Sequence, residues 1–270
     1  MNPFMFRTPI HRDGLIAALL SALVLTGCAA PKHAGPTAPD ARVYAAAAEI
    51  NASPEPSARQ VSDEEAVARI TAIYNQLKPA ALDVCRYIGE DDCNWELTYS
   101  PEEEINAYAS DSSTIVIYKG IVQYARNDAE IAMVIAHEMS HHIANHIRES
   151  QNSQAAGALI GGLAMAILLG ATDTYYPDGV QVGVMVGAMA GVLTYSRKQE
   201  MEADYIAAYI ISKSGFDLED GRGILVKLGR ISGGTTSTVL DTHPAGPERV
   251  AAWDLAAEEI RSGSPMPQKR

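Results

Sequence analysis

The spacing of apolar residues predicts helices along most of the chain and strands over one short central region. After Ser62, apolar residues such as Val67, Ile70 and Ile73 recur every three or four positions, which is the period of an amphipathic helix. The segment Ser62-Asp63-Glu64-Glu65 supplies the polar start of that helix. Further helices are predicted over 41–50, 128–147, 197–213, 218–231 and 248–260, and strands over 95–99, 105–109 and 114–118. We therefore expect an α+β fold that is mainly helical and contains a small sheet.

Two apolar runs in the middle of the chain, 155–171 and 180–193, are rich in Gly, Ala and Met. Glycines recur every fourth residue in both runs, which lines them along one helix face and permits close backbone approach. Each run is shorter than the ~20 residues that a transmembrane helix needs. A tightly packed helical hairpin at or over the active site is therefore favoured over a transmembrane hairpin. Protection of both runs from proteolysis only in the presence of lipid would reverse this preference.

The first 27 residues have the pattern of an export signal. Basic residues precede the short apolar run 15–25, which is typical of a signal peptide. The following Leu25-Thr26-Gly27-Cys28 resembles the lipobox of bacterial lipoproteins, which implies cleavage before Cys28 and acyl chains on that residue. Several acyl chains anchor a protein stably. Position 29 is alanine rather than the aspartate that retains many such lipoproteins at the inner membrane, so the resemblance favours the periplasmic face of the outer membrane. An ordinary signal peptide with an incidental cysteine is the alternative.

The remainder divides into a tether, one domain and a tail. Residues 28–60 are rich in Ala, Pro and Ser and are predicted to be a flexible tether. Residues 61–261 are predicted to form the domain, and 262–270 a tail. Cys85 and Cys93 lie eight positions apart and are predicted to pair as a disulfide in an oxidising compartment, with two unpaired thiols as the alternative.

The charge balance excludes one class of partner. The chain has 21 basic and 33 acidic residues, and removal of 1–27 takes away Arg7, Arg12 and Asp13, which leaves 19 and 32, a formal net charge of -13. Nucleic acids and polybasic contacts with membranes both need a positive surface. No nucleic-acid partner is therefore expected.

The main chemical signal is His137-Glu138-Met139-Ser140-His141, an H-E-x-x-H pattern. On a helix, histidines at i and i+4 project from one face, so both imidazoles reach one Zn²⁺. Glu138 then stands where it accepts a proton from the attacking water. With 7 histidines and 33 acidic residues in 270, the pattern is expected by accident only about 0.02 times. The alternative is a pair of hydrogen-bonded core histidines, but two imidazoles and a carboxylate are costly to bury without partners.

A catalytic zinc also needs a third protein ligand and an open position. A metzincin would have glycine at 144 and histidine at 147, where this chain has alanine and isoleucine, so that class is excluded. Glu200 and Asp204 share one helix face, whereas Glu202 points about 200° away from Glu200, toward predicted surface positions. Glu200 is therefore the predicted ligand, and Asp204 is predicted to accept the outer N–H of a ligating histidine. An ordinary exposed charged face is the alternative for this pair.

Together these residues resemble the HtpX-like and CaaX-prenyl-endopeptidase-like zinc peptidases, and most closely the periplasmic branch that includes the beta-barrel assembly-enhancing protease. The matching segments are 105–109, 115–120, 128–146, 196–204 and 242–244, with Arg249. The resemblance implies a gluzincin-type minimal zincin domain with one Zn²⁺ on His137, His141 and Glu200. It also implies catalysis by Glu138, support of a ligand by Asp204, and an edge strand near 106–109 that pairs with the substrate. Asn145 departs from the family, where many relatives have a basic residue.

Four other residues near these motifs also carry predictions. His243, in a His-Pro pair, is a candidate hydrogen-bond donor to the transition state or an occupant of the open zinc position, and a purely structural role is equally compatible with the sequence. Tyr195 is a second candidate donor. His142 and His146 are predicted to share the catalytic helix but to leave its metal face, as structural or solvent-facing residues.

The predicted function is that of a lipid-anchored, zinc-dependent endopeptidase of the bacterial periplasm. Its expected substrates are misfolded or stalled envelope proteins, including outer-membrane proteins, with the outer-membrane protein assembly machinery as an expected partner. A non-catalytic, chaperone-like zinc-binding lipoprotein is the alternative, although pure binding needs no general base at Glu138. A zinc amidase that acts on the cell wall is a third hypothesis, which the family resemblance does not support.

Overall fold

The computed structural model describes residues 33, 35–89, 93–110, 113–172, 178–191, 195–233 and 243–266. The predicted leader 1–27, Cys28, and the segment 234–242 lie outside the described residues. Within the described part, contacts between residues define two units, a body (33–150 and 195–266) and a helical hairpin (151–191). Each unit is described separately.

The body is built mainly from helices whose ends carry clear capping residues. The side chains of Ser62, Asn127 and Ser196 each accept a hydrogen bond from a backbone N–H in the first turn of their helix, which satisfies donors that the helix itself leaves free. These helices are α2 (Asp40–Ala52), α3 (Asp63–Ile88), α4 (Lys119–Tyr124), α5 (Asp128–Ile143), α8 (Arg197–Ser214), α9 (Leu218–Ser232) and α11 (Pro247–Arg261). Most predicted helix boundaries agree with the structure to within two residues.

A small sheet completes the body. Strands β1 (Glu96–Ser100), β2 (Ala107–Ala109) and β3 (Thr114–Tyr118) have the order β1-β3-β2. The central strand β3 runs parallel to β1, with Leu97 opposite Ile115, and antiparallel to β2, with Ala109 also opposite Ile115. Within the described residues, β2 is therefore an edge strand. The prediction of a mainly helical α+β fold with a small sheet is confirmed.

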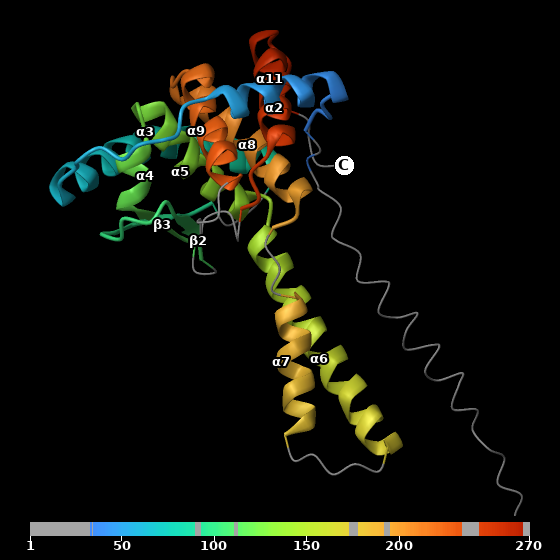
Figure 1. Ribbon diagram of the computed structural model, residues 1–270. Coiled ribbons are helices and arrows are strands. Elements are labelled where there is room, and N and C mark those ends of the chain that lie inside the picture. Colours follow the sequence, from blue (N-terminus) through green and yellow to red (C-terminus); the bar gives the residue numbers. More distant parts are fainter. Residues whose placement is uncertain are drawn as a thin grey trace, which may run out of the picture. The chain divides into compact units, whose positions relative to one another are not determined.

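Helix α5 lies at the centre of the body and contacts α3, α8 and α9 and the strands β2 and β3 (Figure 1). Nearly every residue of α5 is buried, and so are most residues of α8 between Glu200 and Ile211. A helix buried on all sides places even its polar residues in the interior. The polar residues of α5 and α8 must therefore find partners inside the protein.

Cys85, near the end of α3, and Cys93 form a disulfide in the structure. The predicted tether is partly ordered, because α2 occupies residues 40–52 and packs against α11 and α9. The helix predicted over 41–50 is therefore present, and it belongs to the body because Ala46 and Ile50 bury apolar side chains in the core.

The predicted continuous helix over 128–147 is interrupted. Helix α5 ends at Ile143, and Asn145 has a φ of 63°, which is the left-handed conformation. Asparagine tolerates this conformation better than most residues. A new helix, α6 (His146–Thr172), begins immediately afterwards. The prediction of one helix through residue 147 was therefore wrong, and His146 leaves the axis of the helix that carries His137 and His141.

Replacement of Asn145 with alanine is expected to lower the free energy of unfolding by about 1 kcal/mol, because a Cβ without a compensating polar group strains the left-handed conformation. Glycine at this position is expected to cause no loss, because it adopts this conformation freely. Urea denaturation of both variants measures the difference. Equal midpoints for the alanine and glycine variants would contradict the expectation.

The second unit consists of the later part of α6 and of α7 (Gly179–Gly191), which lie side by side (Figure 1). The two backbones approach closely, since a Cβ on Gly183 would lie 2.5 Å from the carbonyl oxygen of Gly161. A tightly packed pair of helices is thus present, although α6 begins nine residues earlier than the predicted run at 155. Its expected place over the active site stays a prediction.

Candidate metal centre

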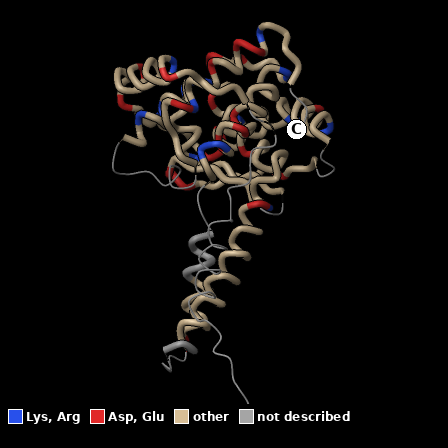
Figure 2. The backbone as a smooth tube through the Cα atoms, turned by 90° about the vertical axis from the view of Figure 1, so that its right-hand side faces the viewer, with Lys and Arg blue, Asp and Glu red and all other residues tan. Residues whose placement is uncertain are grey.

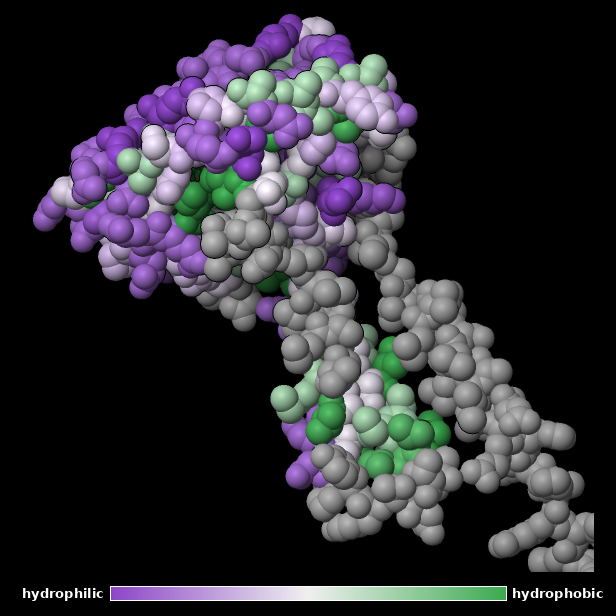
Figure 3. All heavy atoms as spheres, in the orientation of Figure 1, coloured by the Kyte–Doolittle hydropathy of each residue, from purple (hydrophilic) through white to green (hydrophobic). Residues whose placement is uncertain are grey.

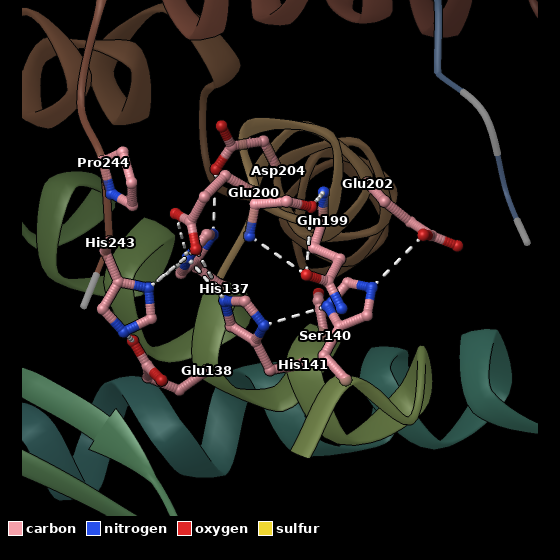
Figure 4. Close-up of polar contacts among 12 residues, drawn as sticks. His137, Glu138, Ser140, His141, Gln199, Glu200, Glu202, Asp204, His243 and Pro244 are labelled. Atoms are coloured by element: carbon pink, nitrogen blue, oxygen red, sulfur yellow. Dashed lines mark hydrogen bonds and ion pairs between the residues drawn. The ribbon is translucent and has the colours of Figure 1, made fainter. Parts of the chain in front are cut away.

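Two buried helices and one loop bring the predicted site residues together. Helix α5 carries His137, Glu138 and His141, and α8, which packs against it, carries Glu200. His243 comes from the segment before α11 and points toward the same centre (Figure 4). All five side chains are buried.

The ligand-type atoms of four residues converge closely. Nε2 of His137 lies 3.0 Å from Nε2 of His141 and 3.3 Å from Oε2 of Glu200. Nε2 of His141 lies 3.4 Å from Oε1 of Glu200. Nδ1 of His243 lies 3.0 Å from Oε1 of Glu200, and one ligand atom from each of the four residues falls within 4.8 Å of the others. The structure therefore unites the three predicted ligands and adds His243 to them.

Glu138 lies beside this cluster. Its Oε1 is 3.7 Å from Nε2 of His243. Its Oε2 is buried, and within the described part of the chain no group donates a hydrogen bond to it. A buried carboxylate oxygen without a donor is costly, which is expected where a carboxylate must remain available to bind a proton.

Asp204 and Arg249 support His137 from behind. Nδ1 of His137 lies 2.9 Å from Oδ1 of Asp204, the residue expected from the sequence to accept the outer N–H of a ligating histidine. Arg249 binds both oxygens of Asp204 at 2.7 Å, and its Nη1 lies 2.6 Å from Oε2 of Glu200. Arg249 had no predicted role beyond matching the family pattern. Two carboxylates that are buried together need a cation beside them, and this need could have assigned Arg249 a role.

A second group of polar residues lies behind His141. Nδ1 of His141 is 3.0 Å from Nδ1 of His146, whose Nε2 is 3.2 Å from Oε2 of Glu202. The other oxygen of Glu202 accepts a hydrogen bond from the backbone N–H of His33 at 2.6 Å and lies 3.2 Å from Nδ1 of that histidine. Figure 4 shows Glu202 on the opposite side of α8 from the metal-facing carboxylate.

These contacts correct two predictions. Glu202 does point away from Glu200, but the expectation that it lies on the surface was wrong, since only 2% of Glu202 is exposed. It is buried because α8 is surrounded by other parts of the body. The assignment of His146 to the catalytic helix was also wrong, because the break at Asn145 turns it back toward His141. The role of His33 was missed, and no spacing rule connects residues 169 positions apart.

Tyr195 lies against the cluster, with its ring stacked on His141 at a centroid distance of 3.8 Å. Burial raises the pKa of Tyr195, and the charges of Glu138 and Glu200 raise it further, so its hydroxyl keeps its proton. His142 is partly buried and is not among the residues that converge on the centre. Tyr195 thus lies against the candidate metal residues, and its role as a hydrogen-bond donor stays a prediction.

The charges of the centre are strongly coupled. Burial alone would lower the pKa of His137, but Glu200 and Asp204 outweigh it and raise the pKa to about 9. Burial lowers the pKa of His141 well below its ordinary value. Burial would raise the pKa of Glu200, yet His243, Arg249 and His137 hold it well below its ordinary value. Glu200 is therefore an ionised carboxylate. It faces His141, whose imidazole is neutral and has a free lone pair, and His137, whose imidazole holds a proton.

This set of donors fits a divalent cation. Because Asp204 and His146 contact the Nδ1 atoms of His137 and His141, both Nε2 atoms are left to face the centre. Two imidazole nitrogens and one carboxylate are a donor set that suits catalytic zinc. A cation at this position would displace the proton that His137 otherwise holds. The residues present therefore match the needs of a metal centre.

Comparison with known proteins places this centre in a family. The model of peptidase family M48 matches residues 73–256, which is more than half of the chain. The chain belongs to peptidase family M48. The matched region includes every residue of the centre described above except His33. The resemblance to this family that the motifs indicated is thus confirmed.

Several relatives in the M48 family are similar over more than half of the chain. Mitochondrial metalloendopeptidase OMA1 of Arabidopsis thaliana is 30% identical over 156 residues, which are 58% of this chain and 30% of that protein. The beta-barrel assembly-enhancing protease of Escherichia coli (strain K12) is 29% identical over 165 residues, which are 59% and 34% of the two chains. The aligned region thus spans about a third of the length of these relatives.

Proposed function

We propose that this chain is a zinc-dependent endopeptidase in which His137, His141 and Glu200 hold one Zn²⁺. The observation that carries the proposal is the convergence of these three side chains from α5 and α8, with the carboxylate of Glu138 beside them. Membership of the M48 family of peptidases supports it. Two histidines and one glutamate leave a fourth position for water or substrate.

The chain's own residues perform the proton transfers. Bound zinc supplies Lewis-acid polarisation of a peptide carbonyl and a lowered pKa of water, toward ~7. Glu138 accepts the proton of the attacking water and then passes it to the leaving amine. Asp204 and Arg249 keep His137 oriented, and Tyr195 donates a hydrogen bond to the developing oxyanion.

His243 is proposed to occupy the fourth position in the resting enzyme and to leave it when substrate binds. Its Nδ1 lies 3.0 Å from Glu200 and 3.3 Å from Nε2 of His137, so its ring stands among the ligands rather than beyond them. The segment 234–242 before it lies outside the described residues. A histidine at that place competes with water for the same position.

The proposed substrates are unfolded or stalled polypeptides of the bacterial envelope. Strand β2 is an edge strand within the described residues, and such an edge binds an extended peptide through its free backbone groups. The name of the Escherichia coli relative, which refers to beta-barrel assembly, supports outer-membrane proteins as substrates and their assembly machinery as a partner. Anchoring through Cys28 at the periplasmic face of the outer membrane remains part of this proposal. The OMA1 relative is mitochondrial by name, so proteins similar to this chain are not confined to the bacterial envelope.

Chelation tests the proposal directly. The purified protein is expected to cleave an unfolded polypeptide. A chelator is expected to remove at least 90% of that activity, roughly a tenfold decrease, because the metal supplies the Lewis acid. Equimolar zinc is expected to restore the activity. Peptidoglycan should remain intact in the same assay. Zinc-dependent binding of the polypeptide without cleavage would instead identify a chaperone-like protein, and release of peptide from peptidoglycan would identify an amidase.

A further inference from the structure

The hairpin of α6 and α7 exposes apolar side chains on several faces. Leu159 is 65% exposed and Leu168 54% exposed, and on α6 these two residues lie about 180° apart. On α7, Val180 and Val182 are both exposed and lie about 200° apart. Figure 3 shows apolar residues along the described surface of this unit. A helix that is apolar all round is normally buried in protein or in a membrane.

Charged residues are absent from both limbs of the hairpin. The sequence has no Lys, Arg, Asp or Glu from Ser150 to Thr172 or from Gly179 to Ser196. Arg148 and Glu149 stand before the first of these stretches, and Arg197 follows the second. Figure 2 shows α6 without charged residues beyond its first turn. Exposed helices of soluble proteins usually carry charges on the face toward water.

The charge-free stretch of α6 is long enough to cross a bilayer. The segment His146–Leu169 is long and apolar enough to cross a membrane, and only 6% of its apolar window is buried, which distinguishes it from the core helix of a soluble domain. Its helix, α6, has 27 residues, or about 40 Å at 1.5 Å per residue. The hydrocarbon interior of a bilayer is about 30 Å thick. This structural length answers the objection that the apolar run alone is too short.

The two helices pack through small residues, as helices do in membranes, where no hydrophobic effect drives them together. A Cβ on Gly183 would lie 2.5 Å from the carbonyl oxygen of Gly161, and one on Gly162 would lie 2.7 Å from a methyl group of Val184. Small residues permit this close backbone approach, and helix pairs in membranes are held together by such packing. The large apolar side chains are consequently left on the outside of the pair.

We propose that this hairpin inserts into the hydrocarbon interior of a lipid bilayer. A protein partner or a second copy of the chain would cover one face, whereas exposed apolar groups lie on opposite sides of α6 and of α7. Only an occupant that surrounds the hairpin covers all of them. The proposal does not depend on peptidase activity, and it gives the chain a membrane contact separate from a lipid on Cys28.

Fluorescence quenching tests the insertion in the full-length chain. A cysteine replaces Leu163, which is 51% exposed on α6, or Val67, which is 41% exposed on α3 and serves as the matched control. Each new thiol carries an environment-sensitive dye, and the protein is reconstituted in phosphatidylethanolamine–phosphatidylglycerol vesicles whose acyl chains are brominated. The dye at 163 is expected to be quenched by the bromines and shielded from aqueous iodide, while the dye at 67 shows the reverse. Any effect of a lipid on Cys28 is equal in both proteins.

A charge in the hairpin should oppose insertion. Leu159→Lys, near the middle of the charge-free stretch 150–172, is expected to shift the insertion equilibrium toward the uninserted state by about 100-fold, the cost of a charge at the centre of a membrane helix, and to restore iodide access at 163. Circular dichroism in solution establishes that this variant keeps its helices. A dye at 163 that iodide reaches in the presence of vesicles would overturn the proposal. So would shielding from iodide without any bromine quenching, which would indicate a second copy or a bound polypeptide.

Discussion

Replacement of Glu138 with glutamine is expected to lower the rate of peptide cleavage by about 10²–10⁴-fold, the usual contribution of a general acid–base group, while zinc stays bound. Glutamine has nearly the same shape but cannot accept the proton of the attacking water. Glu138 is not among the four residues whose ligand atoms converge, and its buried Oε2 receives no hydrogen bond from the described residues. The measurements are kcat on a fluorogenic peptide and the zinc content of the same preparation.

Glu200→Gln is the matched control for this experiment. It makes the same chemical change on the neighbouring helix, but at a residue whose oxygens lie 3.3 and 3.4 Å from the two imidazoles. This variant is expected to lose zinc as well as activity, because a neutral amide is a poor ligand. Activity in the Glu138 variant close to that of the unchanged protein would contradict the proposed role of Glu138. Loss of zinc from that variant would show that Glu138 is a ligand.

The sequence predicted the parts of the fold that follow from local rules. Helix positions agree because the apolar period and the capping residues Ser62 and Ser196 are local signals. The convergence of His137 with His141 follows from the i, i+4 spacing on a helix. The opposite directions of Glu200 and Glu202 follow from the same geometry.

The surroundings of these residues could not be predicted from local rules. Glu202 was expected at the surface because it points away from Glu200, toward positions predicted to be exposed, yet His146 and His33 contact it in the interior. The end of α5 was misplaced because asparagine at position 145 is compatible with both a helix and a left-handed residue. His33 lies 169 positions from its partner, so only the folded structure shows that contact.

The residues that contact Nδ1 of the two candidate histidine ligands were also only partly predictable from local rules. The sequence predicted that Asp204 supports a ligating histidine, because it lies one turn after Glu200 on the same helix face, and in the structure that histidine is His137. It did not predict His146 behind His141, since that contact requires the chain to change direction at residue 145. Both histidines are nevertheless supported through Nδ1, which leaves each Nε2 for the centre.

Replacement of Arg249 with methionine is expected to lower the free energy of unfolding of the zinc-free protein by about 3–5 kcal/mol, the cost of breaking a buried ion pair by removing one partner. Arg249 is 4% exposed and contacts Asp204 and Glu200, neither of which is more than 2% exposed. Without its guanidinium, both carboxylates remain buried with less positive charge beside them. Urea denaturation in a chelator measures this loss.

Zinc and a second arginine make this prediction specific to the centre. With zinc bound, the loss is expected to be smaller, because the dication compensates the charge of Glu200. Arg222→Met is the matched control, since Arg222 also forms forked ion pairs, but with Glu49 and Asp254, whose side chains are 46% and 28% exposed. Water can hydrate these carboxylates again, so a loss of about 1 kcal/mol is expected, with or without zinc. If zinc left the loss from Arg249→Met unchanged, or if both variants cost the same, Arg249 would not be the cation that balances the metal-binding carboxylate.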